Sequence, residues 1–279
     1  RRRRVIRPPL AAALAAALAG CALTVSEPRA LLPVTGFAAL PADPRVEVEP
    51  GFEAYGARVA AELPAAIRDV EAAHYLPFLE PPKIHVCGTD TCFRHWVKTP
   101  KTSAAVVPDH RLFLSPRLAG QEADRLPGLL RHELAHLHLG QRFGHYHSSI
   151  PVWFHEGWAT LTARGGGAEF TSDAGVREAI RAGRRLDFTL RDTPDSRHRA
   201  TAMGLSVHEF YRQAMLVVGW LKTRDEARFR RFALTLQAGA DFEIAFWDVY
   251  GQGPAQRLAG FYDDAMRDNS TDLAAPARP

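Results

Sequence analysis

The sequence predicts an α+β protein with a small mixed sheet, two helices that carry a candidate metal site, and a mainly helical C-terminal part. Three short apolar segments bounded by turn residues predict strands near residues 83–87, 104–107 and 111–115. Apolar residues at helical spacing predict helices at 124–140 and 152–163, and the helical pattern continues from about residue 174. A few strands followed by a run of helices fit the α+β class.

The first twenty residues have the composition of a secretory signal. Five arginines precede a short apolar stretch at 10–18, and the LAGC sequence that ends at Cys21 resembles a bacterial lipobox. This resemblance implies cleavage before Cys21, acylation of its thiol and a lipid anchor in the cell envelope. Ala22 after the cysteine indicates the periplasmic face of the outer membrane. The apolar stretch is short for a membrane span, and an uncleaved anchor is the alternative.

Removal of the signal changes the charge of the chain. The formal net charge of +4 includes five arginines of residues 1–20, a segment without acids, so the mature chain carries −1. Nucleic-acid binding therefore has no support from charge.

The next segments predict a tether, a helix and a loop closed by a disulfide. Residues 21–50 are rich in Pro and Ala and suit a flexible tether, while 51–74 read as a helix that Pro64 kinks or breaks. Cys87 and Cys92 bracket a turn-rich loop, for which a disulfide is the leading interpretation in an oxidising compartment. A two-cysteine metal site is the alternative, but further ligands are lacking nearby.

The candidate metal site begins in the helix predicted from Asp124 to Gly140. It contains the sequence HELAH, in which His132 and His136 lie four residues apart and project from one helix face. Glu133 points to the edge of the same face. Two histidines at this spacing can bind one metal ion, with the glutamate left over for acid–base chemistry.

The predicted helix from Val152 to Ala163 supplies a carboxylate in the sequence WFHEGWA. Glu156 would complete a set of two histidines and one carboxylate with an open fourth position, a set that favours zinc. Two alternatives stay open: Glu156 is simply solvated, or His147 or His155 takes its place. The three glycines at 165–167 that follow this helix read as a hinge or linker.

These motifs together resemble the gluzincins, the thermolysin-like clan of zinc peptidases, and within it the peptidase MA-like domains. The resemblance spans roughly residues 80–250 and implies a thermolysin-like zincin core that holds one Zn²⁺ through His132, His136 and Glu156, with Glu133 as general base. Leu139 and Arg142 stand where metzincins carry Gly and His, and the G-x-M-E-N stretch of the aminopeptidase branch is absent.

The resemblance also implies a donor from a later helix that stabilises the charge developing on the substrate carbonyl. Tyr211 is the first candidate and His208 the second, although a tyrosine packed in the core is the alternative for Tyr211. Thr160 stands where thermolysin-like enzymes often carry an acid that orients the first histidine, so that partner is not identified. Residues 112–115 are expected to border the cleft and pair with an extended substrate, unless they form an ordinary internal strand.

The C-terminal helices are expected at roughly 174–183, 207–222, 225–238, 241–250 and 254–267. The expected organisation is thus a signal peptide (1–20), the tether (21–50), an N-terminal α/β part (51–165), a helical part (166–268) and a disordered tail (269–279).

The expected function is that of a membrane-anchored zinc endopeptidase that hydrolyses an envelope protein or peptide. The rival is a non-catalytic zincin-fold lipoprotein that serves as a binding or assembly module, against which the intact Glu133 argues. A closed structural zinc site would require a fourth ligand such as His147 or His155.

Overall fold

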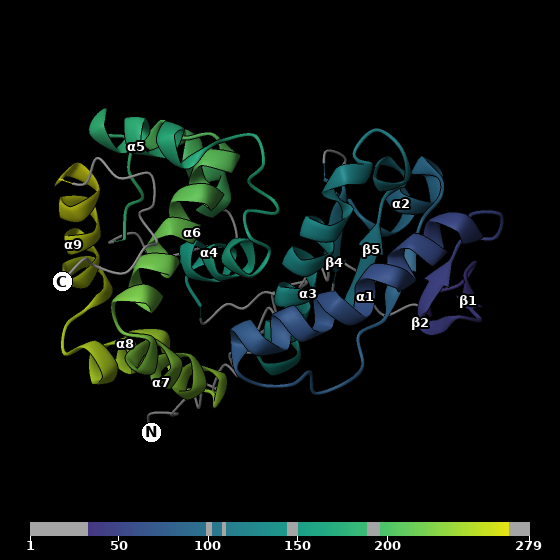
Figure 1. Cartoon of the computed structure of the whole chain (residues 1–279), viewed down its shortest axis with the longest axis horizontal. Coiled ribbons are helices and arrows are strands. Elements are labelled where there is room, and N and C mark those ends of the chain that lie inside the picture. Colours follow the sequence, from purple (N-terminus) through teal and green to yellow (C-terminus); the bar gives the residue numbers. More distant parts are fainter. Residues whose placement is uncertain (1–32, 99–101, 108–109, 144–149, 189–195, 268–279) are drawn as a thin grey trace, which may run out of the picture.

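The computed structural model describes residues 33–98, 102–107, 110–143, 150–188 and 196–267. Over these residues the protein is a mixed α+β structure, as predicted. A sheet with its covering helices forms one half and a cluster of helices the other half (Figure 1).

The sheet has five strands in the order β1-β2-β3-β5-β4. Their bounds are β1 Ala38–Leu40, β2 Asp43–Val48, β3 Ile84–Val86, β4 Ala104–Val107 and β5 Arg111–Leu114. The three inner strands are parallel, and β1 and β4 add antiparallel edges. The predictions near 83–87, 104–107 and 111–115 are therefore confirmed as strands.

One expectation about this part of the chain is wrong, and one open alternative is decided. Residues 38–48 were expected in the tether, but they form β1 and β2, and Val46 and Val48 alternate into the core with the period of a strand. For residues 112–115, the alternative of an ordinary internal strand is the one that the structure has, because β5 lies between β3 and β4. The edge strand beside the site is β4.

Two long helices cover the sheet. The helix α1 (Glu53–His74) packs against α3 (Leu126–Phe143), and their apolar faces form a buried core with the strands. Pro64 lies inside α1 and does not end it. The 3-10 turns Pro116–Ala119 and Ala123–Arg125 lead into α3.

A short helix that the sequence did not predict, α2 (Asp90–Trp96), follows β3. Thr89 caps its first turn by accepting a hydrogen bond from the backbone N–H of Cys92, and a disulfide joins Cys87 to Cys92 across this cap. The loop is thus closed covalently, as the sequence indicated.

The second half of the molecule is helical, as predicted for the C-terminal part, but it also includes the helix that carries Glu156, which was expected in the N-terminal part (51–165). Its helices are α4 Val152–Thr162, α5 Asp173–Arg181, α6 Val207–Arg224, α7 Glu226–Gln237, α8 Phe242–Tyr250 and α9 Pro254–Arg267, with a 3-10 segment at Ser196–Met203. The core of this half is aromatic, and Phe154 of α4 lies among Phe229, Phe232 and Phe242.

The helix α4 joins the two halves. Its residues Trp153, Phe154 and Trp158 belong to the helical core, whereas Ala159 packs with the sheet-side core. The Cβ of an alanine at Gly157 would lie 2.5 Å from the carbonyl oxygen of Ala214 in α6. The absence of a side chain there lets α4 and α6 approach closely.

In the described part of the chain, none of the helices combines the length and apolar character that crossing a membrane requires. Cys21, the expected site of the lipid anchor, lies outside the described residues.

A buried histidine pair connects α1 with α3. The Nδ1 atoms of His74 and His138 lie 3.1 Å apart, and His138 Nε2 lies 2.9 Å from the carbonyl oxygen of Leu76. His74 also stacks on Trp158 of α4, with ring centres 4.2 Å apart. Burial lowers the pKa of His138 to about 4 and holds that of His74 well below its usual range. Both imidazoles are therefore neutral at pH 7.

This pair predicts a loss of stability in mild acid. Because both pKa values are lower in the folded chain than in the unfolded one, the unfolded chain binds more protons as the pH falls below about 6.5. The free energy of unfolding of the metal-free protein should fall between pH 6.5 and 4, by up to about 1.4 kcal/mol per pH unit for each titrating group. Denaturant unfolding at several pH values measures this.

The matched control is His74→Gln, which keeps a donor for His138 but does not titrate. Its stability should fall less steeply with acid than that of the wild type. Equal slopes in the two proteins would show that the pair does not carry the effect.

Candidate metal centre

Three side chains from two helices converge on one point. The Nε2 atoms of His132 and His136 lie 3.1 Å apart, and Oε2 of Glu156 lies 3.3 and 3.2 Å from them. Ligands about 2.0–2.1 Å from a tetrahedral ion are separated by about 3.3 Å, so the spacing of the three atoms fits one such ion. We call these three residues the metal centre. Together they form a group that could hold a metal ion, as predicted.

The metal centre is buried, and its charges favour a cation. Glu156 is only 1% exposed and His132 only 3%. Burial alone would lower the pKa of His132, but the hydrogen bond and charge of Glu156, with help from Glu133, outweigh burial and raise it. A buried carboxylate of this kind stabilises positive charge on the imidazole or on a bound ion.

A backbone carbonyl orients the first histidine. His132 Nδ1 lies 3.0 Å from the carbonyl oxygen of Gly166, and Thr160 Oγ1 lies 3.5 Å from the same nitrogen. When Nδ1–H donates to the carbonyl, Nε2 keeps its lone pair directed at the metal centre. This is the partner that the sequence did not identify.

The glycines at 165–167 therefore support the metal centre in addition to linking α4 to the segment before α5, while their expected role as a hinge stays a prediction. An alanine Cβ at Gly166 would lie 2.6 Å from the backbone of Gly128 in α3. Gly167 has φ +90°, and a Cβ there would lie 2.9 Å from Nδ1 of His132. The loop packs directly against α3, and only glycine fits at both contacts.

Glu133 lies beside the metal centre without belonging to it. Its Oε2 accepts a hydrogen bond of 3.1 Å from the backbone N–H of Val106 in β4, and the residue is 9% exposed. The carboxylate is therefore held between α3 and the edge of the sheet, one residue after a candidate ligand.

The two candidate donors from α6 occupy different places. The ring of Tyr211 stacks on that of His132, with centres 5.8 Å apart and an angle of 28° between the planes. The ring of His208 packs edge-on against Phe170 at 4.7 Å. The structure thus brings Tyr211 against the metal centre and places His208 one helical turn away.

The alternative third ligands receive no support. His155 is buried with its ring centre 5.3 Å from that of His136, yet in the described chain the converging group contains Glu156 and not His155. His147 lies outside the described residues.

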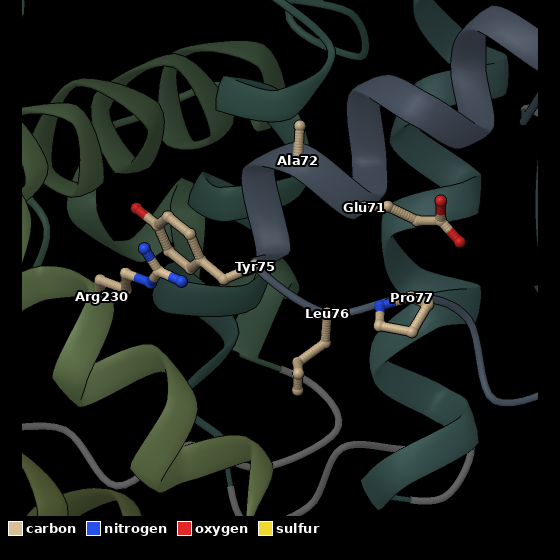
Figure 2. Close-up of a pocket in the computed structure, with 6 residues that line it drawn as sticks. All are labelled: Glu71, Ala72, Tyr75, Leu76, Pro77 and Arg230. Carbon is tan, nitrogen blue, oxygen red and sulfur yellow. The ribbon is translucent and has the colours of Figure 1, made fainter.

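Two other places in the molecule do not form a comparable site. Glu49 lies near Cys87 and Cys92, but the cysteines are joined in the disulfide, and Glu49 accepts hydrogen bonds from Gly88 and Thr89. A shallow pocket of ≈ 440 Å³ at the end of α1 is lined by residues that include Glu71, Tyr75 and Arg230 (Figure 2). It offers a single carboxylate and no histidine or cysteine.

Comparisons with known proteins do not identify the chain: no family model matches it, and neither a curated protein nor a solved structure matches it.

Replacing Gly167 by Ala should weaken metal binding. The added methyl group collides with the imidazole of His132 and turns it away from the ligand position, so zinc affinity should fall by about 10- to 100-fold. Competition with a chelator of known affinity measures this.

Gly239→Ala is the matched control, because Gly239 has φ +96° but nothing within 4 Å of an added Cβ. It introduces the same backbone strain and should keep the affinity of the wild type. Equal affinities of both variants would refute the role of the loop.

Glu156→Ala should also lower zinc affinity, by about 10-fold or more, because it removes a ligand as well as the negative charge of a buried site. Glu133→Gln serves as the control at a neighbouring carboxyl and should keep its metal. Unchanged occupancy in Glu156→Ala would assign the third ligand position to a histidine.

Proposed function

We propose that this protein is a zinc-dependent endopeptidase of the gluzincin type. One observation carries the proposal: three ligand atoms have the mutual spacing of a metal site, and a fourth group, Glu133, lies beside them without being needed as a ligand. A site that served only to hold a metal ion would not need a further carboxylate for proton transfer.

The donor set supports zinc. Two imidazole nitrogens and one carboxylate oxygen from the protein, with room for a fourth ligand, are typical of catalytic zinc sites, whereas structural sites are closed by four protein ligands. When bound, zinc would supply Lewis acidity that polarises the scissile carbonyl and acidifies water.

Glu133 would act as the general base. Its carboxylate would take a proton from the attacking water and pass it to the leaving amine, a role that needs a carboxylate not bound to the metal. The hydrogen bond from Val106 fixes one of its oxygens, so the side chain is held in place before substrate arrives.

Tyr211 would act on the other side of the scissile bond. The ring of Tyr211, which belongs to α6, packs against the ring of His132. Its hydroxyl would donate a hydrogen bond to the carbonyl oxygen as negative charge develops there. His208, which packs against Phe170, is the weaker candidate for this role.

The proposed substrate is a protein or peptide in an extended conformation. The strand β4 lies at the edge of the sheet beside α3, and Val106 of this strand contacts Glu133. A peptide that adds to this edge would pass the catalytic carboxylate. With a lipid anchor at Cys21, as the lipobox implies, the enzyme would act in the bacterial envelope, on the periplasmic face of the outer membrane.

Glu133→Gln tests the proposed function. The amide keeps the size of the side chain and its acceptor for Val106 but cannot take a proton, so cleavage of a peptide library should fall by about 10²- to 10⁴-fold. Metal content should stay near one zinc per chain. Mass spectrometry of the products and metal analysis of the same sample measure both quantities.

Undiminished cleavage in this variant would contradict the assigned role of Glu133. If the zinc-loaded wild type cleaves nothing, and Glu133→Gln restores a deletion strain as well as the wild type does, the chain is a non-catalytic binding or assembly module.

A further inference from the structure

An exposed aromatic side chain with a fixed orientation lies close to the metal centre. Phe170 is 71% exposed, and its ring contacts a charged group and an aromatic group from two different elements. The guanidinium carbon of Arg125 lies 5.0 Å from the ring centre, and the ring of His208 packs against it at 81°. Such contacts fix the orientation of the ring without covering it.

Two routes connect Phe170 to His132. Along the chain, the backbone N–H of Gly167 donates to Glu169, the neighbour of Phe170, and Gly167 itself borders the His132 ring. Along α6, His208 and Tyr211 are three residues apart and so share a helix face, and Tyr211 stacks on His132. Phe170 therefore lies at the rim of the metal centre on the α6 side.

The groups around Phe170 form what we call the rim cluster: Glu122, Arg125, Glu169, Phe170 and His208. Arg125 forms ion pairs with both Glu122 and Glu169. Glu122 also accepts a hydrogen bond of 2.6 Å from Ser103, the residue before β4. The rim cluster thus extends from the beginning of the edge strand to the beginning of α6.

The charge of the rim cluster disfavours an acidic occupant. One guanidinium faces two carboxylates, which leaves one net negative charge and no spare positive charge to bind an acidic side chain. Burial lowers the pKa of His208, so this residue adds no charge near pH 7. The exposed ring of Phe170 is the apolar surface of the rim cluster.

We propose that Phe170 forms one wall of a subsite that binds an aromatic or large aliphatic side chain of the peptide substrate. This inference rests on the proposed function, because it assumes that a peptide lies along β4 and past the metal centre. It goes beyond that function by naming the side-chain class that the enzyme prefers. Covering the ring with an apolar side chain removes its exposed surface from water, which stabilises such a peptide over one with a small or acidic residue.

Binding of peptide hydroxamates tests the subsite without requiring cleavage, because the hydroxamate group binds zinc. The zinc-loaded protein is titrated calorimetrically with tripeptide hydroxamates that carry Phe, Leu, Ala or Glu at one position at a time. The wild type should prefer Phe over Ala at one position by about 10-fold. In Phe170→Ala this ratio should fall to near one at unchanged zinc content, and Phe170→Tyr should keep it.

Trp247→Ala is the matched control. Trp247 is also a large exposed aromatic residue, at 57%, but it belongs to α8 in the helical half of the molecule. Its removal should leave the preference unchanged. If Phe170→Ala keeps the wild-type ratio at every position, the inference is overturned, whatever the outcome of the cleavage assay.

The two proposals can fail separately. If the wild type binds hydroxamates with a preference that depends on Phe170 but cleaves no peptide, the subsite proposal is supported and the peptidase proposal is refuted. If the wild type cleaves peptides with the same side-chain preference as Phe170→Ala, the peptidase proposal is supported and the subsite proposal is refuted.

Discussion

The metal centre depends on the close packing of α4 between α3 and α6. Ten of its eleven residues are buried, and Gly157 brings its backbone against the carbonyl of Ala214. Because Gly157 directly follows Glu156, this backbone contact fixes the point at which the Glu156 side chain leaves the helix. The same contact draws α6 in, which brings Tyr211 to the ring of His132. The close contact between α4 and α6 therefore brings Glu156 and Tyr211 to the histidine of α3.

The local features of this site could be predicted from the sequence, whereas the features that depend on distant contacts could not. The spacing of His132 and His136 and the presence of both helices follow from a period of 3.6 residues that is visible within a short window, although α3 continues past Gly140 to Phe143. The role of the Gly166 carbonyl has no such signal, since every residue carries a carbonyl group. The strands β1 and β2 were missed for a related reason: short strands in a Pro- and Ala-rich segment are stabilised by pairing with β3, far along the chain.

Position on α3 determines what each histidine can do. His132 faces Glu156, whose hydrogen bond and charge outweigh the effect of burial and raise the pKa of the imidazole. His138 lies six residues after His132 and points to a different side of the helix, where it meets His74. The same residue type thus serves a polar site on one face of the helix and a neutral core contact on another.

The hydrogen bond between Glu133 and Val106 also bears on how the protein avoids association with its own copies. An unpaired edge strand offers backbone N–H groups to any extended chain, and natural sheets often block this with an inward-pointing charge. Here the carboxylate occupies the N–H of Val106 in the middle of β4, so any strand that adds to this edge, whether substrate or another copy of the chain, must first displace this hydrogen bond, which disfavours edge-to-edge dimerisation and fibril growth. A residue suited to proton transfer would then also protect the exposed edge of the sheet.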